Sequence, residues 1–432
     1  MKSIEDIYSI YLKFPKVFTD SRQAVNGGIF FALKGDNFDG NDFAEKAIAE
    51  GANYAVVDKK GLEGKDKIIY VEDVLTALQK LANHHRRQLK TPILAITGTN
   101  GKTTTKELIA SVLRTKYNIQ ATQGNLNNHI GVPLTLLSLS KEHEIGIVEM
   151  GANHPGEIEF LCLIAEPDLG IITNVGKAHI EGFGSFDGVK KTKGELYQFI
   201  AKKGKGIFIN ADNEHLMGMA PASVEKYTYS VTSENAQLRG EVANADLLLV
   251  CRVLFDKGWL YLKTNLSGAY NLENVLAAAR IGLYFNIDPL LIQKGIETYT
   301  PSNNRSQLIR KGENTILMDC YNANPSSMEA SLKNFMQIEK SGKVFILGDM
   351  LELGNVSDEE HQKIVDLLSG FKKAEVFLVG ENFSKTNCPS EFRKFMSIDE
   401  LKPEVEKNHW ENRFILIKGS RGIKLEKVIE SI

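Results

Sequence analysis

The residues with the strongest potential for chemistry form a glycine-bracketed loop, GTNGKT at 98–103, that directly follows the apolar run 93–97. An apolar run, a glycine loop and an amphipathic stretch in this order predict a buried strand, a phosphate-binding loop and a helix. The glycines let backbone N–H groups approach an anion, and the helix directs its positive end to the same point. Lys102 would reach the β- and γ-phosphates of a nucleotide, and the Thr103 hydroxyl would ligate Mg²⁺.

This loop departs from the full Walker A pattern, because position 96 is isoleucine where that pattern has glycine. A Gly-Lys-Thr triplet alone is a weak signal. Here it stands directly between a predicted strand and a predicted helix, which is the context that the motif requires. We therefore predict nucleotide phosphate binding rather than an ordinary glycine turn. The ATP-binding residues predicted from the loop are Gly98, Thr99, Asn100, Gly101, Lys102, Thr103 and Thr104.

A magnesium site would need more than the Thr103 hydroxyl, since hard cations take several oxygen ligands. Glu149 ends an apolar run, and a carboxylate in that place needs a charged partner or a metal. We predict it as the second ligand. Two further candidates have ordinary explanations. A lone His179 after a strand is usually a core or surface residue, and Lys193 with Glu195 close by is most simply a solvated ion pair.

Composition and charge restrict the class of protein. The 432 residues exceed the size of a single core, so two or three domains are expected. Lys and Arg number 52 against 54 Asp and Glu, and the resulting charge of −2 favours neither a nucleic-acid nor an anionic-membrane partner. The four scattered cysteines form no C-x-x-C pair, which argues against a zinc site or a disulfide scaffold. With no signal-peptide pattern and no apolar run of membrane length, we expect a cytoplasmic protein.

Three regions follow from the alternation of apolar runs and helical patterns. We predict a first domain at 1–90, a central domain at 91–299 and a last domain at 300–432. Thr91-Pro92 marks the first boundary, because the residue before proline is pushed out of helical conformation. Strands that alternate with helices predict parallel sheets, with ligands at the carboxyl ends of the strands. The expected fold is therefore α/β, with a small N-terminal domain, a central phosphate-loop domain carrying a β-hairpin appendage within 226–266, and a smaller Rossmann-like last domain.

Three further segments have mainly structural explanations. The Asp-Ser-Arg run at 20–22 precedes a glycine-bounded strand pattern and is more often a turn with an ion pair than a ligand site. The predicted helix 74–89 ends in His-His-Arg-Arg at 84–87, which we interpret as a solvated helix terminus. The pattern from 424 onward predicts a final helix. None of these segments predicts a ligand site on its own.

Several motifs occur together and in order, and through them the chain closely resembles the Mur ligases, the ATP-dependent amide-forming ligases of peptidoglycan precursor synthesis. The resemblance extends over nearly the whole chain. The runs at 321–325 and 347–354 are typical of one branch of that family, and the Asp-Asn-Pro-Arg signature of the diaminopimelate- or lysine-adding branch is absent. The matching stretches are 19–40, 97–107, 124–133, 149–158, 173–185, 193–196, 319–328, 347–354 and 418–421.

The resemblance changes the interpretation of the second pair of metal candidates. In the family, the lysine that matches Lys193 is typically carbamylated and helps to hold a second Mg²⁺, and the histidine that matches His179 serves the same metal. A carbamate carries two oxygens and a negative charge, whereas an ammonium would repel the metal. The resemblance thus implies ATP and two Mg²⁺ sites, with Thr103, Glu149, His179 and a carbamylated Lys193 as ligands.

Nucleotide contacts also follow from the resemblance. Asn271 and Asn274 match the side chains with which the family contacts adenine. Asp319 matches its ribose contact, and Arg305 matches its γ-phosphate contact. Tyr270 is a departure, since the family usually has histidine before the first of these asparagines. The catalytic residues implied are Lys102, His179, Lys193 and Arg305.

The substrates implied by the resemblance are a UDP-MurNAc-tripeptide and D-Ala-D-Ala, joined after ATP phosphorylates the terminal carboxylate of the tripeptide. Ser21 and Arg22 would hold the UDP end, and Asn127 and Asn128 would face the muramoyl part. We expect a monomer. Two alternatives stay open at this point: a related ATP-dependent ligase of the folylpolyglutamate or cyanophycin type, and a non-enzymatic scaffold or switch that rearranges with ATP.

Overall fold

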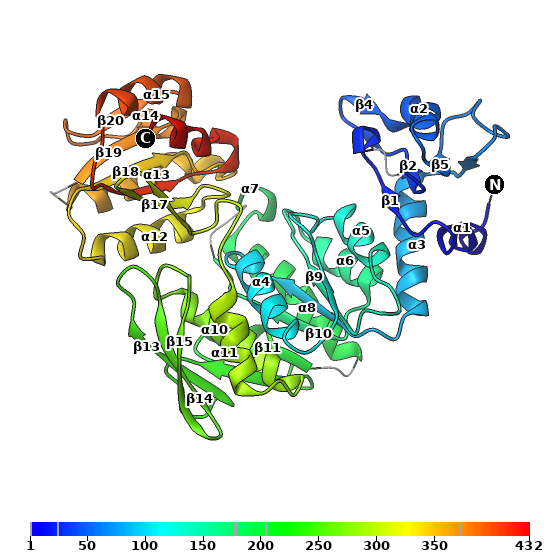
Figure 1. The fold of residues 1–432 in the computed structure, drawn as a ribbon, viewed down its shortest axis with the longest axis horizontal. Coiled ribbons are helices and arrows are strands. Elements are labelled where there is room, and N and C mark those ends of the chain that lie inside the picture. The colour runs from blue at the N-terminus through cyan, green and yellow to red at the C-terminus, as the bar shows by residue number, and fades with distance from the viewer. Residues whose placement is uncertain (1, 24–25, 177–179, 204–205, 372–373) are drawn as a thin grey trace.

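The computed structural model describes residues 2–23, 26–176, 180–203, 206–371 and 374–432. Figure 1 shows three α/β units, with the N-terminal unit at the right, the central unit below and the C-terminal unit at the upper left. None of the described helices is both long and apolar enough to cross a bilayer. The predicted α/β fold in three units is confirmed.

A small parallel sheet forms the N-terminal unit, with the strand order β1-β2-β5-β6. Its first helix begins with a capping box, in which Ser3 and Asp6 exchange side-chain and backbone hydrogen bonds. The elements are α1 (Ile4–Tyr11), β1 (Val17–Phe18), η1 (Ser21–Gln23), β2 (Ile29–Phe31), β3 (Lys34–Gly35), β4 (Phe38–Asp39), η2 (Gly40–Phe43), α2 (Ala44–Ala49), β5 (Tyr54–Val57), β6 (Ile68–Tyr70) and α3 (Val74–Gln88).

The central unit is built on one nine-stranded sheet in the order β15-β14-β13-β12-β11-β10-β7-β9-β8. The strands from β8 to β13 pair in parallel, and β13, β14 and β15 pair antiparallel. The predicted hairpin at 256–258 is present, and it widens this sheet rather than forming a separate appendage. The elements are β7 (Ile93–Thr97), α4 (Lys102–Leu113), β8 (Ile119–Ala121), α5 (Gly131–Leu137), β9 (Ile145–Glu149), α6 (Glu157–Ala165), β10 (Leu169–Ile172), α7 (Ile180–Phe183), α8 (Phe186–Lys203), β11 (Gly206–Asn210), α9 (Glu214–Met219), β12 (Glu225–Ser230), β13 (Leu238–Asn244), β14 (Val250–Phe255), β15 (Gly258–Lys263), α10 (Asn271–Tyr284) and α11 (Pro289–Thr298).

Strand β7 delivers the phosphate loop and is buried on both faces, as a central strand of a parallel sheet should be. Because side chains alternate along a strand, Ile93 and Ala95 join the hydrophobic cluster under α3, α5, α6 and α8. Leu94 and Ile96 join the opposite cluster, under α4 and α10. The loop at the end of this strand is therefore anchored by a core on each side.

At the C-terminal end of helix α3, His85 and Arg86 are buried while Arg87 is exposed, so the prediction of a solvated terminus is wrong for the first two. His85 and Arg86 are 5% and 9% exposed. Arg86 donates hydrogen bonds to Asp168 Oδ2 at 2.7 Å and to the Ala165 carbonyl at 3.0 Å, and His85 Nε2 lies 2.9 Å from the Leu139 carbonyl oxygen. The basic run fixes the N-terminal unit to the central one, because these partners belong to the central unit.

The C-terminal unit has a six-stranded sheet in the order β16-β17-β21-β18-β19-β20, in which only the β16–β17 pair is antiparallel. Strand β16 was not predicted, and the final helix predicted from 424 onward is present as a 3₁₀ helix. The elements are β16 (Gln307–Lys311), β17 (Asn314–Asp319), α12 (Pro325–Gln337), β18 (Lys343–Gly348), η3 (Gly354–Val356), α13 (Ser357–Ser369), β19 (Ala374–Val379), α14 (Glu381–Ser384), β20 (Arg393–Phe395), α15 (Ile398–Lys407), β21 (Phe414–Lys418), η4 (Arg421–Ile423) and η5 (Leu425–Ser431).

Candidate active site

The phosphate loop joins β7 to α4 through two glycines in conformations that other residues rarely adopt. Gly98 has φ of +146°, and a Cβ at this position would lie 2.0 Å from Thr173 Oγ1. Gly101 has φ of +76° and is the N-cap of α4. The Asn100 N–H donates a hydrogen bond to Asn174 Oδ1 at 2.9 Å. The loop is thus held against the end of the neighbouring strand β10, as the context of the motif predicted.

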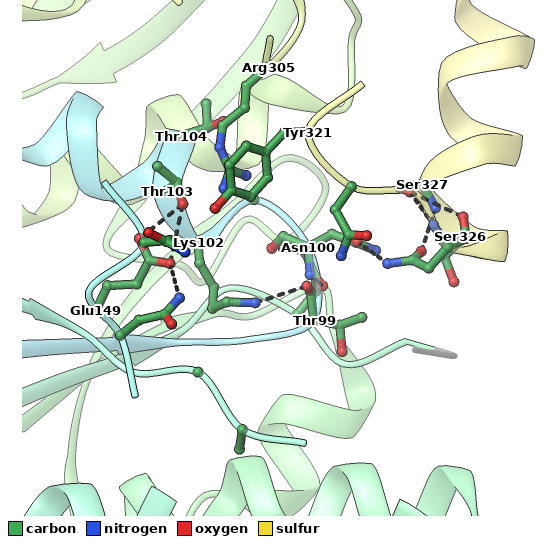
Figure 2. A pocket seen from close by; sticks show the side chains of 18 of the residues that line it. Thr99, Asn100, Lys102, Thr103, Thr104, Glu149, Arg305, Tyr321, Ser326 and Ser327 are labelled. Atoms are coloured by element: carbon green, nitrogen blue, oxygen red, sulfur yellow. Dashed lines mark hydrogen bonds between the residues drawn. The ribbon is translucent and has the colours of Figure 1, made fainter. Parts of the chain in front are cut away.

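A cavity of about 1020 Å³ opens over this loop, between the central and C-terminal units. Figure 2 shows Lys102, Thr103 and Glu149 on one side of it and Arg305 and Tyr321 above them. The structure therefore brings together residues that are far apart in sequence. The predicted site residues that line the cavity are Thr99, Asn100, Gly101, Lys102, Thr103, Thr104, Asn127, Asn128, Glu149, Asn271, Asn274, Arg305 and Asp319.

Glu149 and Thr103 form the centre of the candidate magnesium site. The Thr103 hydroxyl donates to the Glu149 carboxylate, with distances of 2.9 Å to Oε2 and 3.2 Å to Oε1. Asn127 Nδ2 donates to Glu149 Oε1 at 2.9 Å. Among the described residues no three His, Cys, Asp or Glu side chains gather as a metal-binding group. A hydroxyl with one carboxylate nevertheless fits Mg²⁺, which commonly takes one or two protein ligands and completes its shell with phosphate and water oxygens.

The two lysines of the predicted catalytic set are close enough to affect each other. Burial lowers the pKa of Lys102; the Glu149 carboxylate opposes this shift and the Arg305 guanidinium adds to it. Burial also lowers the pKa of Lys193 to about 7, and the nearby charge of Lys102 contributes. Lys193 Nζ lies 3.4 Å from the carbonyl oxygen of Ala152, which is itself part of the cavity wall. Lys193 is 2% exposed, so the solvated ion pair that its sequence context suggested is wrong.

The side chains predicted to contact adenine and ribose are already tied to protein groups. Asn274 accepts a hydrogen bond from Thr105 Oγ1 at 2.9 Å and donates to Asn271 Oδ1 at 2.8 Å. Asp319 accepts from the Ser306 N–H at 3.1 Å and forms an ion pair with the buried Lys418. These bonds orient the side chains at the edge of the cavity before any ligand arrives.

Of the predicted residues that the structure describes, four do not line the cavity: Ser21, Arg22, Gly98 and Lys193. Arg22 forms an ion pair with Asp20 at 2.8 Å, and its side chain is 87% exposed. Ser21 is next to it in η1, and neither residue lines the cavity. His179 lies outside the described residues.

The C-terminal unit contributes polar residues that reasoning from the sequence did not assign to the site. Asn324 Nδ2 donates to Asn100 Oδ1 at 2.7 Å, so the N-cap of α12 touches the phosphate loop. The Asn-Pro pair at 324–325, with Ser327 two residues later, is a recognisable helix start. That signal predicts the helix cap but not the contact with Asn100, which is 224 positions away in the sequence. Other cavity residues from this unit are Tyr321, Asn322, Ser326, Ser327, Glu352 and Lys418.

Comparisons with known proteins identify the class. Three family models match in succession: Mur ligase family, catalytic domain, over 14–86; Mur ligase middle domain over 96–282; and Mur ligase, glutamate ligase domain, over 304–421. A curated UDP-N-acetylmuramoyl-tripeptide--D-alanyl-D-alanine ligase of Bacillus subtilis (strain 168) is 34% identical over 427 residues, which cover 96% of this chain and 92% of that protein. The chain therefore belongs to the Mur ligase family and is an enzyme, which sets aside the scaffold alternative.

Within the family, solved structures indicate the MurF branch. MurF from Acinetobacter baumannii has a TM-score of 0.85 at 29% identity, and the match covers 96% of this chain and 92% of that one. MurF from Thermotoga maritima, crystallised in complex with ADP, has a TM-score of 0.84 at 25% identity, with 100% and 98% covered. The runs at 321–325 and 347–354 had indicated one branch, and the relatives confirm that this branch is MurF.

Proposed function

We propose that the chain joins D-Ala-D-Ala to UDP-MurNAc-tripeptide in an ATP-dependent, ADP-forming reaction that passes through an acyl phosphate. One observation carries the proposal. A single cavity combines a phosphate loop, a buried carboxylate at Glu149, the Arg305 cation and the amide-rich start of α12. Full-length relatives named for this reaction support the choice of substrates.

The first step must activate the acid, because an ionised carboxylate is a poor electrophile. An oxygen of the terminal carboxylate of the tripeptide attacks the γ-phosphorus of ATP. The bond from that phosphorus to the β,γ-bridging oxygen breaks, and ADP leaves with the electron pair. Lys102 and Arg305 stabilise the negative charge on the transferring oxygens, since both cations face the same part of the cavity.

The second step forms the amide bond. The neutral amine of D-Ala-D-Ala attacks the acyl carbon and loses one proton to solvent, and inorganic phosphate leaves with the electron pair of the broken carbon–oxygen bond. The start of α12 lies beside the phosphate loop, so the incoming dipeptide enters from the C-terminal unit. Closure of that unit over the cavity would keep water away from the acyl phosphate.

Magnesium, when bound, supplies positive charge to the phosphate oxygens. Thr103 and Glu149 would hold it. A second Mg²⁺ would be held by a carbamate on Lys193 together with His179. The environment of Lys193 supports this modification, because a buried lysine with a pKa of about 7 has a neutral amine that can react with carbon dioxide.

The remaining assignments complete the proposal. Asn271 and Asn274 contact adenine and Asp319 contacts ribose. The UDP end lies on the N-terminal unit at Ser21 and Arg22, and the muramoyl part lies against Asn127 and Asn128. The working division into domains is 1–90, 91–299 and 300–432. We further propose that the enzyme acts as a monomer in the cytoplasm.

Release of ADP from the purified chain tests the proposal. We expect release only when ATP, Mg²⁺, UDP-MurNAc-tripeptide and D-Ala-D-Ala are all present. Replacing the peptides with a folate and glutamate should give none, which separates the reaction from the folylpolyglutamate alternative. Lys102→Ala should abolish the release, and the exposed Lys141→Ala should leave it unchanged. Unchanged turnover in Lys102→Ala would contradict the assignment of the phosphate loop.

A further inference from the structure

The Arg305 guanidinium lies over an aromatic ring in the wall of the cavity. Its Cζ atom is 3.6 Å from the centroid of the Tyr321 ring. Figure 2 shows the two side chains side by side above Lys102 and Thr103. A guanidinium stacked in this way is attracted by the negative face of the ring and loses rotational freedom.

The backbone holds these two residues opposite each other. Arg305 precedes strand β16 and Tyr321 follows strand β17, so they stand across the open end of an antiparallel pair. The Tyr321 N–H donates to the Asn304 carbonyl at 3.2 Å, and the Ser306 N–H donates to Asp319 Oδ1 at 3.1 Å. Hydrogen bonds of the two residues that flank Arg305 therefore fix the position of its backbone.

The segment around Arg305 is also conformationally unusual. Asn303, Asn304 and Ser306 have φ values of +56°, +57° and +48°, in the left-handed region that non-glycine residues seldom occupy. Such a segment persists only where its surroundings hold it. The left-handed backbone costs conformational free energy, and in return the loop presents the Arg305 side chain to the cavity.

The positive charge of Arg305 explains why it needs an aromatic ring beside it. The contact that the structure gives the Arg305 guanidinium is with the neutral Tyr321 ring, which leaves its positive charge in place. Lys102 is close enough that the two cations repel, since Arg305 lowers the pKa of Lys102. The Tyr321 ring supplies an attraction that an aliphatic side chain could not, and it does so without neutralising the guanidinium.

We propose that Tyr321 is a positioning residue, whose ring holds the Arg305 guanidinium over the phosphate loop where it meets the terminal phosphate of ATP. This inference rests on the proposed function only in taking ATP as the nucleotide. The acting group is the ring, and the Tyr321 hydroxyl is not required. Tyr321 thereby links the binding of the terminal phosphate to Asn324, the N-cap of α12, three residues further along the chain.

A double-mutant cycle on nucleotide binding tests the inference without peptide substrates. Titration calorimetry on the full chain with Mg²⁺ gives the dissociation constants for ADP and for a non-hydrolysable ATP analogue. The ratio of the two reports the contacts made to the terminal phosphate. The proteins compared are wild type, Tyr321→Leu, Arg305→Ala, the double variant, Tyr321→Phe and Arg310→Ala.

We expect the preference for the ATP analogue over ADP to fall by about 2-fold to 30-fold in Tyr321→Leu, the range that a cation–π contact spans. Tyr321→Phe should keep the wild-type preference, because it keeps the ring. In the Arg305→Ala background, Tyr321→Leu should have no further effect. Arg310 is a matched control, since it is an exposed arginine of strand β16, the strand that Arg305 precedes. Its removal should change nothing.

Equal losses from Tyr321→Leu in both backgrounds would overturn the inference, as would an unchanged preference in that variant. Thermal unfolding checks that each variant is folded, and Tyr321→Met replaces Tyr321→Leu in the cycle if the leucine variant does not fold. ADP release with the peptide substrates is measured in parallel. If the effects of Tyr321→Leu and Arg305→Ala on nucleotide binding are coupled but the wild type does not turn over the peptide substrates, only the proposed substrates are contradicted. If the wild type turns over normally but the two effects on binding are additive, only the role of Tyr321 is contradicted.

Discussion

The Thr103 hydroxyl donates a 2.9 Å hydrogen bond to Glu149 Oε2, which joins the first turn of α4 to the last residue of β9. Glu149 is almost fully buried, at 1% exposure. A buried carboxylate is costly unless cations or donors surround it. Besides its bonds with Thr103 and Asn127, Glu149 has the Lys106 ammonium at 4.0 Å, and Lys102 is close enough to interact with its charge. This pairing of hydroxyl and carboxylate is what makes the end of β9 suitable for a metal.

Glu149→Gln should therefore weaken magnesium binding while keeping the shape of the site. The amide can still accept from Thr103, but it lacks the charge that attracts a divalent cation. We expect the Mg²⁺ concentration needed for half-maximal ADP release to rise at least about tenfold. Glu144→Gln is the matched control, because Glu144 is exposed and lies just before the other end of the same strand. An unchanged Mg²⁺ requirement in Glu149→Gln would contradict the assignment.

Lys193 should make activity depend on pH and carbon dioxide. Burial lowers its pKa to about 7, so the amine is mostly neutral above that pH and mostly protonated below it. Only the neutral amine reacts with carbon dioxide, so the carbamate should form above pH 7 and be lost as pH falls below it. We expect activity to fall between pH 8 and pH 6 and bicarbonate to restore part of it near pH 7. Carbon-13 NMR with labelled bicarbonate would detect the carbamate.

Replacement of the same lysine gives an independent check. Lys193→Ala should be inactive, and short carboxylic acids should restore part of its activity by supplying the missing oxygens. Lys191→Ala changes an exposed lysine on the same helix and should behave as wild type. Full activity of Lys193→Ala with no added acid would show that the carbamate is not needed.

Asn324 should matter both as a helix cap and as a contact between units, and two substitutions separate these roles. Its side chain accepts from the Ser327 N–H at 2.9 Å and donates to Asn100 Oδ1 at 2.7 Å. Asn324→Asp keeps the capping oxygen but removes the donor, so we expect native stability and ADP release slowed about 2-fold to 10-fold. Ser397→Ala removes the cap of α15 instead and should cost about 1 kcal/mol of stability without slowing the reaction. Wild-type rates in Asn324→Asp would mean that the contact with Asn100 plays no part in turnover.

Arg86 should contribute to stability far more than its exposed neighbour. Its guanidinium pairs with Asp168 and donates to the carbonyls of Ala165 and Glu166, and its side chain is 10% exposed. Arg86→Ala should lower the free energy of unfolding by about 2 to 4 kcal/mol, because it leaves buried acceptors without donors. Arg87 also pairs with Glu166, but its side chain is 62% exposed, and Arg87→Ala should cost less than about 1 kcal/mol. Urea denaturation of both variants measures the difference, and equal effects would contradict the structural role of Arg86.

Local signals in the sequence were sufficient for the phosphate loop and its surroundings. The order of apolar run, glycine loop and helix predicted β7, the loop and α4, since each of these depends on residues that are neighbours in the chain. The same holds for Glu149, whose position at the end of an apolar run marked it as unusual. The resemblance to a known family then extended the site to Arg305 and Asp319, which no local pattern would have connected with the loop.

Contacts between distant segments could not be predicted in this way. A basic helix end looks the same in sequence whether it faces water or buried carbonyl groups, which is why the burial of Arg86 was missed. The contact of Asn324 with the phosphate loop depends on how two separate sheets are placed. The stacking of Arg305 on Tyr321 likewise depends on the pairing of β16 with β17, and β16 itself carried too weak a pattern to be predicted.

The fate of the carboxylate oxygens tests the central claim most directly. UDP-MurNAc-tripeptide labelled with oxygen-18 in its terminal carboxylate is incubated with the enzyme, ATP, Mg²⁺ and D-Ala-D-Ala, and the released phosphate is analysed by mass spectrometry. An acyl phosphate requires one labelled oxygen to leave with each phosphate, because the bond that breaks joins the acyl carbon to that oxygen. Phosphate released without label while the amide product accumulates would contradict the account.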